Sequence, residues 1–451
     1  MSESRFSYSL EQLQEMSARV LRLGKAAGAS AAETDISLGI GQNVSVRMGE
    51  TETIEYNRDK GASVTVYFGQ RRGHASTSDL SDQALADTVA AACNIARYTA
   101  QDPFCGLADA ELMATEFPDL DLYHAWDISV EEAIELAKRC EAAARAVDTR
   151  ISNSEGASVS NSESLSVYAN SHGFCAGYPT SRHGISASVI AEQGDSMQRD
   201  YWYTTARAPA DLETPEHVGR LAGQRTVRLL GCRKLKTAHV PVLFEAPLAG
   251  GLISSLISAV SGGNLYRKSS FLLDSLGKPV IASIVDIEEQ PHLPKGLASS
   301  AFDAEGVATR PRMLVEQGVL QGYLLSSYSA RKLGMTSTGN AGGNHNLLVR
   351  HAGGAGQQQS FEQLLQTMGT GLLVTELLGH GLNMVTGDYS RGAAGFWVEN
   401  GVIAYPVEEI TIAGNLKDML MQIVALGSDV LVQSSRQVGS VLIERMTVAG
   451  E

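Results

Sequence analysis

The sequence predicts an α+β protein. Its N-terminal part is a two-layer α/β unit with an antiparallel sheet, and its C-terminal part is a mostly antiparallel β domain with a few helices. Three observations predict this class: the chain opens with a helical apolar pattern, the pattern then switches to alternate residues, and hairpin-turn signals recur in the last third. A chain of 451 residues is too long for one core, so we expect more than one domain.

The N-terminal α+β region is expected to span residues 1–125. Ser9 is followed three residues later by Gln12, which is the spacing of a capping box and predicts a helix that begins here. Apolar residues then alternate with polar ones and predict three strands, over 36–48, around 54–56 and over 63–68. Because an antiparallel sheet with one apolar face needs a cover, we expect a helix over residues 81–99 to pack on it.

The central region, residues 126–232, is expected to be rich in strands and to pack against this first unit. Ser129 and Glu132 repeat the capping-box pattern and predict another helix. Residues 151–203 are rich in Ser, Asn and Gly, which is typical of long meandering hairpins. A helix over about 215–230 closes the region.

The C-terminal domain, residues 233–451, is expected to consist mostly of β structure. Two hairpins are predicted from their turns, at Gln317-Gly318 and at Asn400-Gly401. Such pairs accept the positive φ angles that two-residue hairpin loops require. The candidate functional site lies near the start of this domain.

Composition excludes several classes of function. The formal net charge of −14, with Lys and Arg only in short pairs, argues against a nucleic-acid surface, which needs clustered basic residues. A membrane helix needs about 20 consecutive apolar residues, and no apolar run of this sequence is close to that length. The polar start does not resemble a signal peptide. Five widely spaced cysteines without a Cys-x-x-Cys pair are typical of reduced thiols. We therefore expect a cytoplasmic protein that binds neither nucleic acid nor membrane.

A strand that leads directly into a helix marks the candidate site. Residues 240–244 are apolar, Glu245 follows them, and Pro247 fits the first position of the helix. A carboxylate at a helix start interacts favourably with the helix dipole. Glu245 therefore has a structural explanation beside any catalytic one.

Several short stretches occur in an order that points to one family. They lie at 153–158, 167–174, 266–272, 302–307, 322–325, 330–335, 337–340, 386–392, 399–401 and 406–407. In these stretches and their order the chain resembles the PmbA/TldD family, once called modulators of DNA gyrase, and specifically its PmbA (TldE-type) branch.

The resemblance implies a metal site that this chain has lost. Catalytic members carry His-Glu-x-x-x-His at the start of this helix and a cysteine near the end of the chain, and the glutamate acts as base on a zinc-bound water. Here the aligned positions hold Phe244, Glu245 and Ala249, and neither a phenyl ring nor a methyl group can bind zinc. The C-terminal domain has no cysteine and offers Ser434 and Ser435 instead. The resemblance thus implies no catalytic residue and no cofactor in this chain, with zinc on a TldD-type partner.

Another candidate lies further along the chain. Glu376 and His380 are four residues apart, so on a helix they would share one face and form a pair of metal ligands. The preceding Thr375 is a poor zinc ligand, which leaves two donors where a zinc site needs three. The competing interpretation of His380 is a structural histidine.

The expected function follows from the resemblance. We expect the non-catalytic, PmbA-type subunit of a cytoplasmic zinc-dependent peptidase that cleaves unfolded peptides, leader peptides and small labile proteins. Its expected partner is a TldD-type chain, and in isolation it is expected to form a homodimer. The sequence assigns no substrate-binding residue. Two alternatives remain: an autonomous metallohydrolase that uses Glu376 and His380, and a non-enzymatic binding protein that acts on a target such as DNA gyrase.

Overall fold

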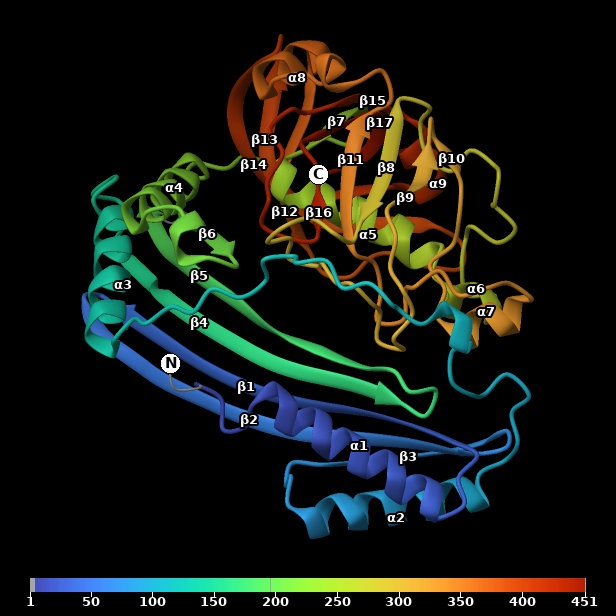
Figure 1. Cartoon of the computed structure of the whole chain (residues 1–451). Coiled ribbons are helices and arrows are strands. Elements are labelled where there is room, and N and C mark those ends of the chain that lie inside the picture. Colours follow the sequence, from blue (N-terminus) through green and yellow to red (C-terminus); the bar gives the residue numbers. More distant parts are fainter. Residues whose placement is uncertain (1–4, 195, 451) are drawn as a thin grey trace.

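A six-stranded antiparallel sheet organises the first half of the chain. The computed structural model describes residues 5–194 and 196–450 (Figure 1). The strands follow the order β3-β2-β1-β4-β5-β6, and their bounds are β1 (Ala31–Arg47), β2 (Glu50–Phe68), β3 (Arg71–Thr77), β4 (Asn153–Asn170), β5 (Cys175–Gln193) and β6 (Ser196–Ala206). Because β1 pairs with both β2 and β4, the N-terminal and central regions share one sheet. The α+β class predicted from the sequence is confirmed.

Strand β2 corrects one sequence-based expectation. The strands predicted around 54–56 and over 63–68 are a single strand, which pairs with β1 from Glu50 to Tyr67. Strand β3 covers only residues 62–68 of β2, so the earlier part lies at the edge of the sheet. Residues 57–60 are therefore polar because this edge is exposed to solvent, and not because the strand ends there.

Four helices cover one face of this sheet. Helices α1 and α2 pack over one end of it, and α3 and α4 pack over the other (Figure 1). The capping boxes predicted at Ser9 and Ser129 are both formed, and each cap contributes about 1 kcal/mol to helix stability. The bounds of the helices are α1 (Leu10–Ala26), α2 (Asp82–Tyr98), α3 (Val130–Arg145) and α4 (Pro215–Arg228).

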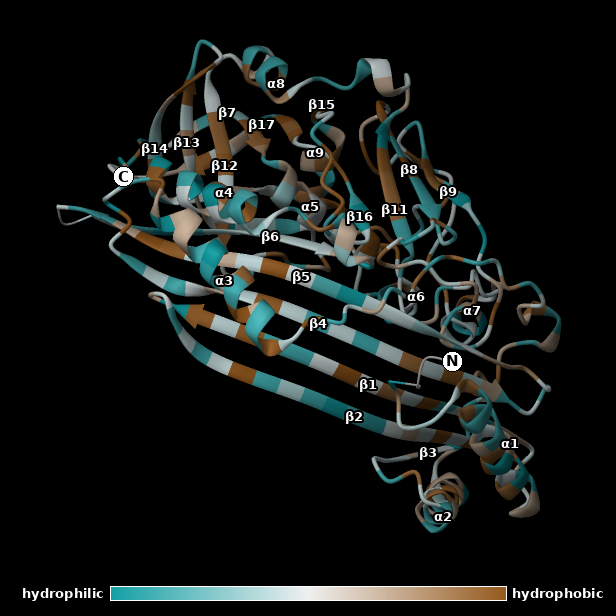
Figure 2. Cartoon of the chain, turned by 60° about the vertical axis from the view of Figure 1, so that its left-hand side comes forward, coloured by the Kyte–Doolittle hydropathy of each residue, from teal (hydrophilic) through white to brown (hydrophobic). Residues whose placement is uncertain are grey.

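The opposite face of the sheet carries small polar residues and faces the C-terminal domain. Hydrophobic and hydrophilic residues alternate along the long strands, as Figure 2 shows. On this face the Tyr178 hydroxyl lies 2.7 Å from the Ser300 hydroxyl, and the rings of Tyr178 and Phe302 are 5.6 Å apart. The β4 residues of the same face are Ser158, Ser160, Ser162, Ser164 and Ser166. Ser162 in this row is exposed and the other four serines are half-buried, so the C-terminal domain does not cover the row completely.

Two sheets and several helices form the C-terminal domain. One sheet has the order β10-β9-β8-β11-β16, and the other has the order β14-β13-β12-β7-β17-β15 with an additional β14–β17 pairing. Helix α5 packs in the core to which both sheets contribute. The strands are β7 (Ala238–Phe244), β8 (Val285–Gln290), β9 (Arg312–Glu316), β10 (Val319–Leu320), β11 (Asn346–His351), β12 (Gly371–Leu378), β13 (Asp388–Glu399), β14 (Val402–Asn415), β15 (Ile423–Leu426), β16 (Arg436–Gln437) and β17 (Val441–Ala449). The helices are α5 (Ala246–Ala259), α6 (Gly262–Tyr266), α7 (Ser327–Leu333), α8 (Phe361–Met368) and α9 (Leu416–Met421).

A long connection between α2 and α3 ties the two halves together. It passes between the sheet and the C-terminal domain (Figure 1). The Tyr328 hydroxyl of α7 donates to Asp102 at 2.7 Å, and the Arg331 guanidinium donates to the carbonyl of Gly106 at 3.2 Å. In the part of the chain that the structure describes, no helix combines the length and apolar character needed to cross a membrane.

Both predicted hairpin turns are confirmed. Gln317 and Gly318 have φ angles of 47° and 79° between β9 and β10, and Asn400 and Gly401 have 52° and 75° between β13 and β14. Positive φ at both central residues is the condition for a type I′ turn. Glycine accepts this conformation without the steric cost that a Cβ atom introduces.

We expect the change Gly401→Ala to destabilise the C-terminal domain by about 1–2 kcal/mol, because an L-residue with a side chain is strained in the left-handed region. Gly251 of α5 is the matched control: a Cβ atom there meets nothing within 4 Å. Helical glycine is about 0.5–1 kcal/mol less favourable than alanine, so Gly251→Ala is expected to stabilise. Urea unfolding of the three proteins checks both signs, and equal effects of the two changes would contradict the turn assignment.

Candidate functional site

The junction of β7 and α5 lies inside the C-terminal domain. Strand β7 lies between β12, to which it is parallel, and β17. Glu245 is the N-cap residue of α5, but its side chain makes no capping hydrogen bond. The Ser440 hydroxyl caps the helix instead, since it accepts the N–H of Ala246 at 3.0 Å and donates to Asp429 at 2.6 Å. The Glu245 carboxylate is therefore directed to other partners.

The two positions where the resembled family carries histidine are filled by core residues. Phe244 and Ala249 have no solvent-exposed surface, and both belong to the hydrophobic core of the C-terminal domain. Neither side chain has a nitrogen, oxygen or sulfur atom that a metal could bind. Burying the Phe244 ring contributes about 1.5–3 kcal/mol to folding, so this position now serves packing.

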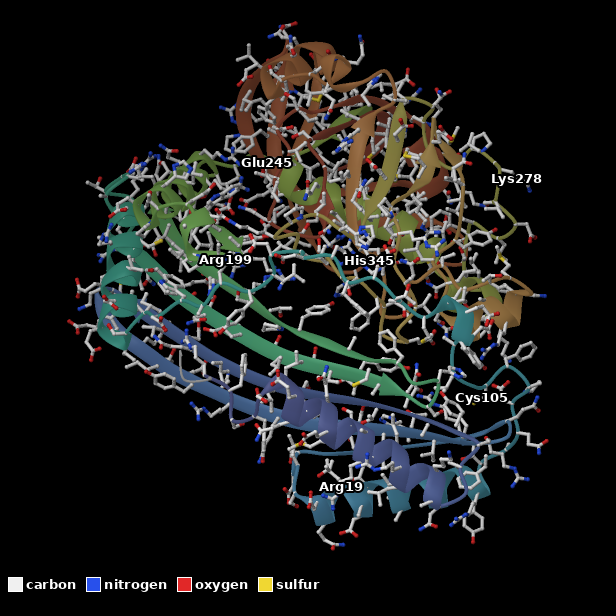
Figure 3. All side chains as sticks on the ribbon, in the orientation of Figure 1. Arg19, Cys105, Arg199, Glu245, Lys278 and His345 are labelled. Carbon is white, nitrogen blue, oxygen red and sulfur yellow. The ribbon has the colours of Figure 1, made fainter. Side chains whose placement is uncertain are left out.

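Two arginines of α4 hold the Glu245 carboxylate. The Arg225 guanidinium donates to both carboxylate oxygens, at 3.1 and 3.0 Å, and Arg228 donates to one of them at 3.3 Å. Glu245 lies where the C-terminal domain meets the central region (Figure 3). The side chains of Glu245 and Arg225 are only 13% and 11% exposed, so this pair is largely removed from water.

The same arginine bridges a second buried carboxylate. Arg225 Nε lies 3.0 Å from Asp200 Oδ2, in an ion pair that lacks hydrogen-bond alignment, and its guanidinium carbon lies 5.3 Å from the centre of the Trp202 ring. Burial raises the pKa of Asp200, against the opposing charge of Arg225. Burial alone would lower the pKa of Arg225. The negative charges of Glu245 and Asp200 outweigh the effect of burial, so the pKa of this arginine is raised. The cluster therefore depends on the mutual pairing of its charges.

This arrangement does not fit zinc. A catalytic zinc site needs three protein donors and an open position for water. At the α5 start neither former histidine position offers a donor, and two cationic side chains already contact Glu245. Across residues 5–194 and 196–450, no group of three or more His, Cys, Asp and Glu side chains is arranged to hold a metal ion.

The two serines that the sequence offers in place of the family's C-terminal cysteine bond to main-chain groups. The Ser434 hydroxyl accepts a hydrogen bond from the N–H of Arg436 at 3.1 Å. The Ser435 carbonyl accepts one from the N–H of Leu347. Arg436 follows them and packs near Gly250 of α5, where a Cβ atom would lie 4.0 Å from its side chain. The oxygen groups that this end of the chain brings to the helix start are those of Ser440 and Asp429, and the Ser440 hydroxyl is already used to cap α5.

The helical pairing expected for Glu376 and His380 is wrong. Glu376 lies in strand β12, and His380 follows the end of that strand. His380 lines a hollow of about 240 Å³ together with Leu377, the neighbour of Glu376. Successive side chains of a strand point to opposite faces, and Glu376 instead lies near Arg199 and Asp200. Burial, with Asp200 as a lesser cause, raises the pKa of Glu376. The i, i+4 spacing wrongly predicted a helix here, because a run of Leu and Glu is compatible with a strand as well as with a helix.

Sequence reasoning missed the residues that define this site. Arg225 and Arg228 are three residues apart on the helix that the sequence predicts over about 215–230. Their spacing indicates that they share one face of that helix. Their partner Glu245 lies beyond a domain boundary, and Asp200 lies on another strand. Only the tertiary structure brings these four residues together.

Comparisons with known proteins match nearly the whole length of the chain. Family models described as PmbA/TldA metallopeptidase domain 1, central domain and C-terminal domain match residues 32–96, 123–230 and 237–450. The metalloprotease PmbA of Escherichia coli O157:H7 is 53% identical over 96% of this chain and 94% of its own length. The metalloprotease PmbA homolog of Haemophilus influenzae is 49% identical over 98% and 96% of the two chains. A crystal structure of a putative modulator of DNA gyrase from Bacteroides thetaiotaomicron covers 98% of this chain and 99% of its own, with a TM-score of 0.92 and 27% identity.

We expect Arg225→Ala to destabilise the protein by about 3 kcal/mol, because removal of one partner leaves a charge buried without compensation. Arg220 of the same helix is exposed and serves as the matched control, with an expected change of less than about 0.5 kcal/mol after conversion to Ala. Urea unfolding of both variants checks this. An Arg225→Ala effect as small as that of the control would show that the cluster does not hold the two halves together.

Proposed function

This chain belongs to the PmbA/TldD metallopeptidase family, and we propose that it acts as the non-catalytic, PmbA-type subunit of a zinc-dependent peptidase. The observation that carries the proposal is the state of Glu245, which is the one surviving residue of the family's metal motif. Its carboxylate contacts Arg225 and Arg228 and has no metal-binding neighbour in Phe244 or Ala249. A general base must reach the proton that it removes, and this carboxylate is already held by two cations.

The proposed partner is a TldD-type chain that carries the zinc. Related chains of one family can replace each other across an isologous interface, so the same surface would serve a homodimer in isolation and the heteromeric peptidase. We propose that the C-terminal β domain supplies this surface. In such a complex the present chain contributes its fold, the subunit interface and part of the wall of the substrate cleft.

The proposed substrates are unfolded polypeptides in the cytoplasm, including leader peptides and small labile proteins. An extended peptide is recognised through its main chain when it adds to the edge of a sheet. The long strands of this protein and the low charge of the sheet face toward the C-terminal domain support that mode of recognition. A direct action on DNA receives no support, since the net charge is −14.

We expect the purified, tag-free chain to bind zinc only in substoichiometric amounts, because the α5 start lacks donors. Elemental analysis after dialysis against micromolar zinc measures this, with His380→Ala as a comparison variant. One zinc per chain that is lost in His380→Ala would favour the autonomous hydrolase. One zinc per chain that persists in that variant would reveal a site elsewhere and would equally contradict the proposal.

We expect peptidase activity to appear only when this chain is mixed with a relative that retains His-Glu-x-x-x-His. The change Glu245→Gln should leave that activity nearly intact, whereas Glu→Gln in the partner's motif should lower it by about 100-fold or more, since it removes the base. Cleavage of an unstructured peptide is measured for both mixtures, and gel filtration confirms that each complex assembles. A loss of activity with Glu245→Gln in an intact complex would assign chemistry to this residue and overturn the proposal.

A further inference from the structure

Strand β5 has an unpaired edge that borders a cavity. Strand β6 covers β5 only over residues 183–193, so residues 175–182 lie at the edge of the sheet. Part of this edge is closed by the connection from α2 to α3, because the Ser181 N–H donates to the Leu122 carbonyl at 2.9 Å. Between residues 117–123 and residues 175–179 there is a cavity of about 500 Å³. This volume falls within the range of about 300–1,000 Å³ that is usual for ligand pockets.

The register of β4 and β5 determines which main-chain groups face this cavity. In an antiparallel ladder, residues alternate between those that bond to the partner strand and those that point away from it. Ser181 points away from β4, since its N–H reaches Leu122, whereas the Phe174 carbonyl accepts from Asn170 of β4. By alternation, Gly177 and Cys175 direct their N–H and C=O groups away from β4. Among the strands that the structure describes, none pairs with these groups.

The walls of the cavity suit an apolar side chain. Phe117 forms part of one wall and packs against the rings of Phe174 and Phe302, with centroids 6.2 and 6.0 Å away. Phe117 as a whole residue remains 53% exposed, so it has surface left to contact a ligand. Further large apolar residues of the lining are Pro118, Leu120, Leu122, Tyr123, Tyr178 and Pro179.

The charge at the cavity favours a positive group. Asp121 lies 3.0 Å from His124 Nε2, and its own N–H donates to Asp119 Oδ1 at 3.0 Å. The Asp119 carboxylate is exposed, and within the described ranges no Lys, Arg or His side chain lies at ion-pair distance from it. A lysine, an arginine or a free amino terminus of a ligand would meet an unneutralised carboxylate here.

We propose that this edge binds an extended peptide by strand addition to residues 175–179, with an apolar side chain in the cavity and a positive group against Asp119. Main-chain hydrogen bonds to the unpaired edge would give affinity without strong sequence preference, and the cavity would select the apolar residue. The inference deepens the proposed function and rests on it, because a peptidase subunit meets its substrate as an unfolded chain. A strand of a partner subunit is the competing occupant, and the test separates the two.

The test uses the isolated full-length chain and peptides with a C-terminal fluorescein label. The parent probe is N-acetylated Ala-Lys-Ala-Phe-Ala-Ala, and binding is measured by fluorescence anisotropy. Modification of the peptide main chain is preferable to mutation of the edge, since a Cβ atom on Gly177 would lie 2.0 Å from the Ser166 carbonyl oxygen. We expect N-methylation at alternate peptide positions to weaken binding by about tenfold and at the intervening positions to have little effect.

Two sets of variants test the cavity and its charge. Asp119→Asn keeps an acceptor for the Asp121 N–H and is expected to weaken the lysine peptide by about two- to fivefold, the range of an exposed ion pair. Asp59→Asn, at an exposed position of β2, is the matched control and should change nothing. A peptide with alanine in place of lysine, with either a free or an acetylated amino terminus, shows which positive group Asp119 recognises. Phe117→Ala should weaken only peptides that contain phenylalanine.

The position of the bound peptide is checked through Cys175, which is exposed and lines the cavity. Peptide should slow its alkylation by iodoacetamide in proportion to occupancy, while the half-buried Cys232 outside the cavity keeps its rate. Absence of binding, equal effects of N-methylation at all positions, or unprotected Cys175 would each overturn the proposal. Protection of Cys175 by a zinc-bearing partner without peptide would assign the edge to the subunit interface and overturn it as well. Because none of these measurements requires peptidase activity, failure of the inference is distinguishable from failure of the proposed function.

Discussion

Two buried carboxylates and the arginine between them constrain the relative position of the two halves of this protein. Glu245 begins α5 in the C-terminal core, Asp200 lies on β6, and Arg225 projects from α4, which packs on the long sheet. Removing such charges from water costs several kcal/mol per ion, and their mutual attraction offsets this only in a well-defined geometry. The halves of the molecule are thus held where these charges meet.

The same constraint supports the proposed structural role of Glu245 at the start of α5. A glutamate that acts on a metal-bound water needs the metal within reach and a lone pair that is free to accept a proton. Glu245 instead accepts hydrogen bonds from two guanidinium groups, while Phe244 and Ala249 add to the apolar core. The positive charge beside this carboxylate comes from the side chains of Arg225 and Arg228. The peptide-binding edge that we propose lies elsewhere, on the long sheet and beside the connection that crosses it.

Local signals in the sequence were sufficient for much of the fold. Capping boxes and the Asn-Gly turn involve residues within three or four positions of each other, so they act the same way in any context. Pairing between distant segments was not predictable in this way. The edge of β2 is polar and looked like a break between strands, and the Thr375–His380 segment fits two periodicities. The arginine cluster joins three elements that are separated along the chain, and no spacing in the sequence encodes it.

A double-mutant cycle between Arg225 and Glu245 tests the central claim most directly. It compares the free energies of unfolding of the wild type, Arg225→Ala, Glu245→Gln and the double variant, and so isolates the coupling of the two side chains. The account predicts a coupling free energy of about 2 kcal/mol or more, because either single change removes one charge of a buried pair and leaves the other with only its secondary partner, Arg228 for Glu245 and Asp200 for Arg225. A coupling near zero would mean that Glu245 does not depend on Arg225, and the structural assignment of this carboxylate would be wrong.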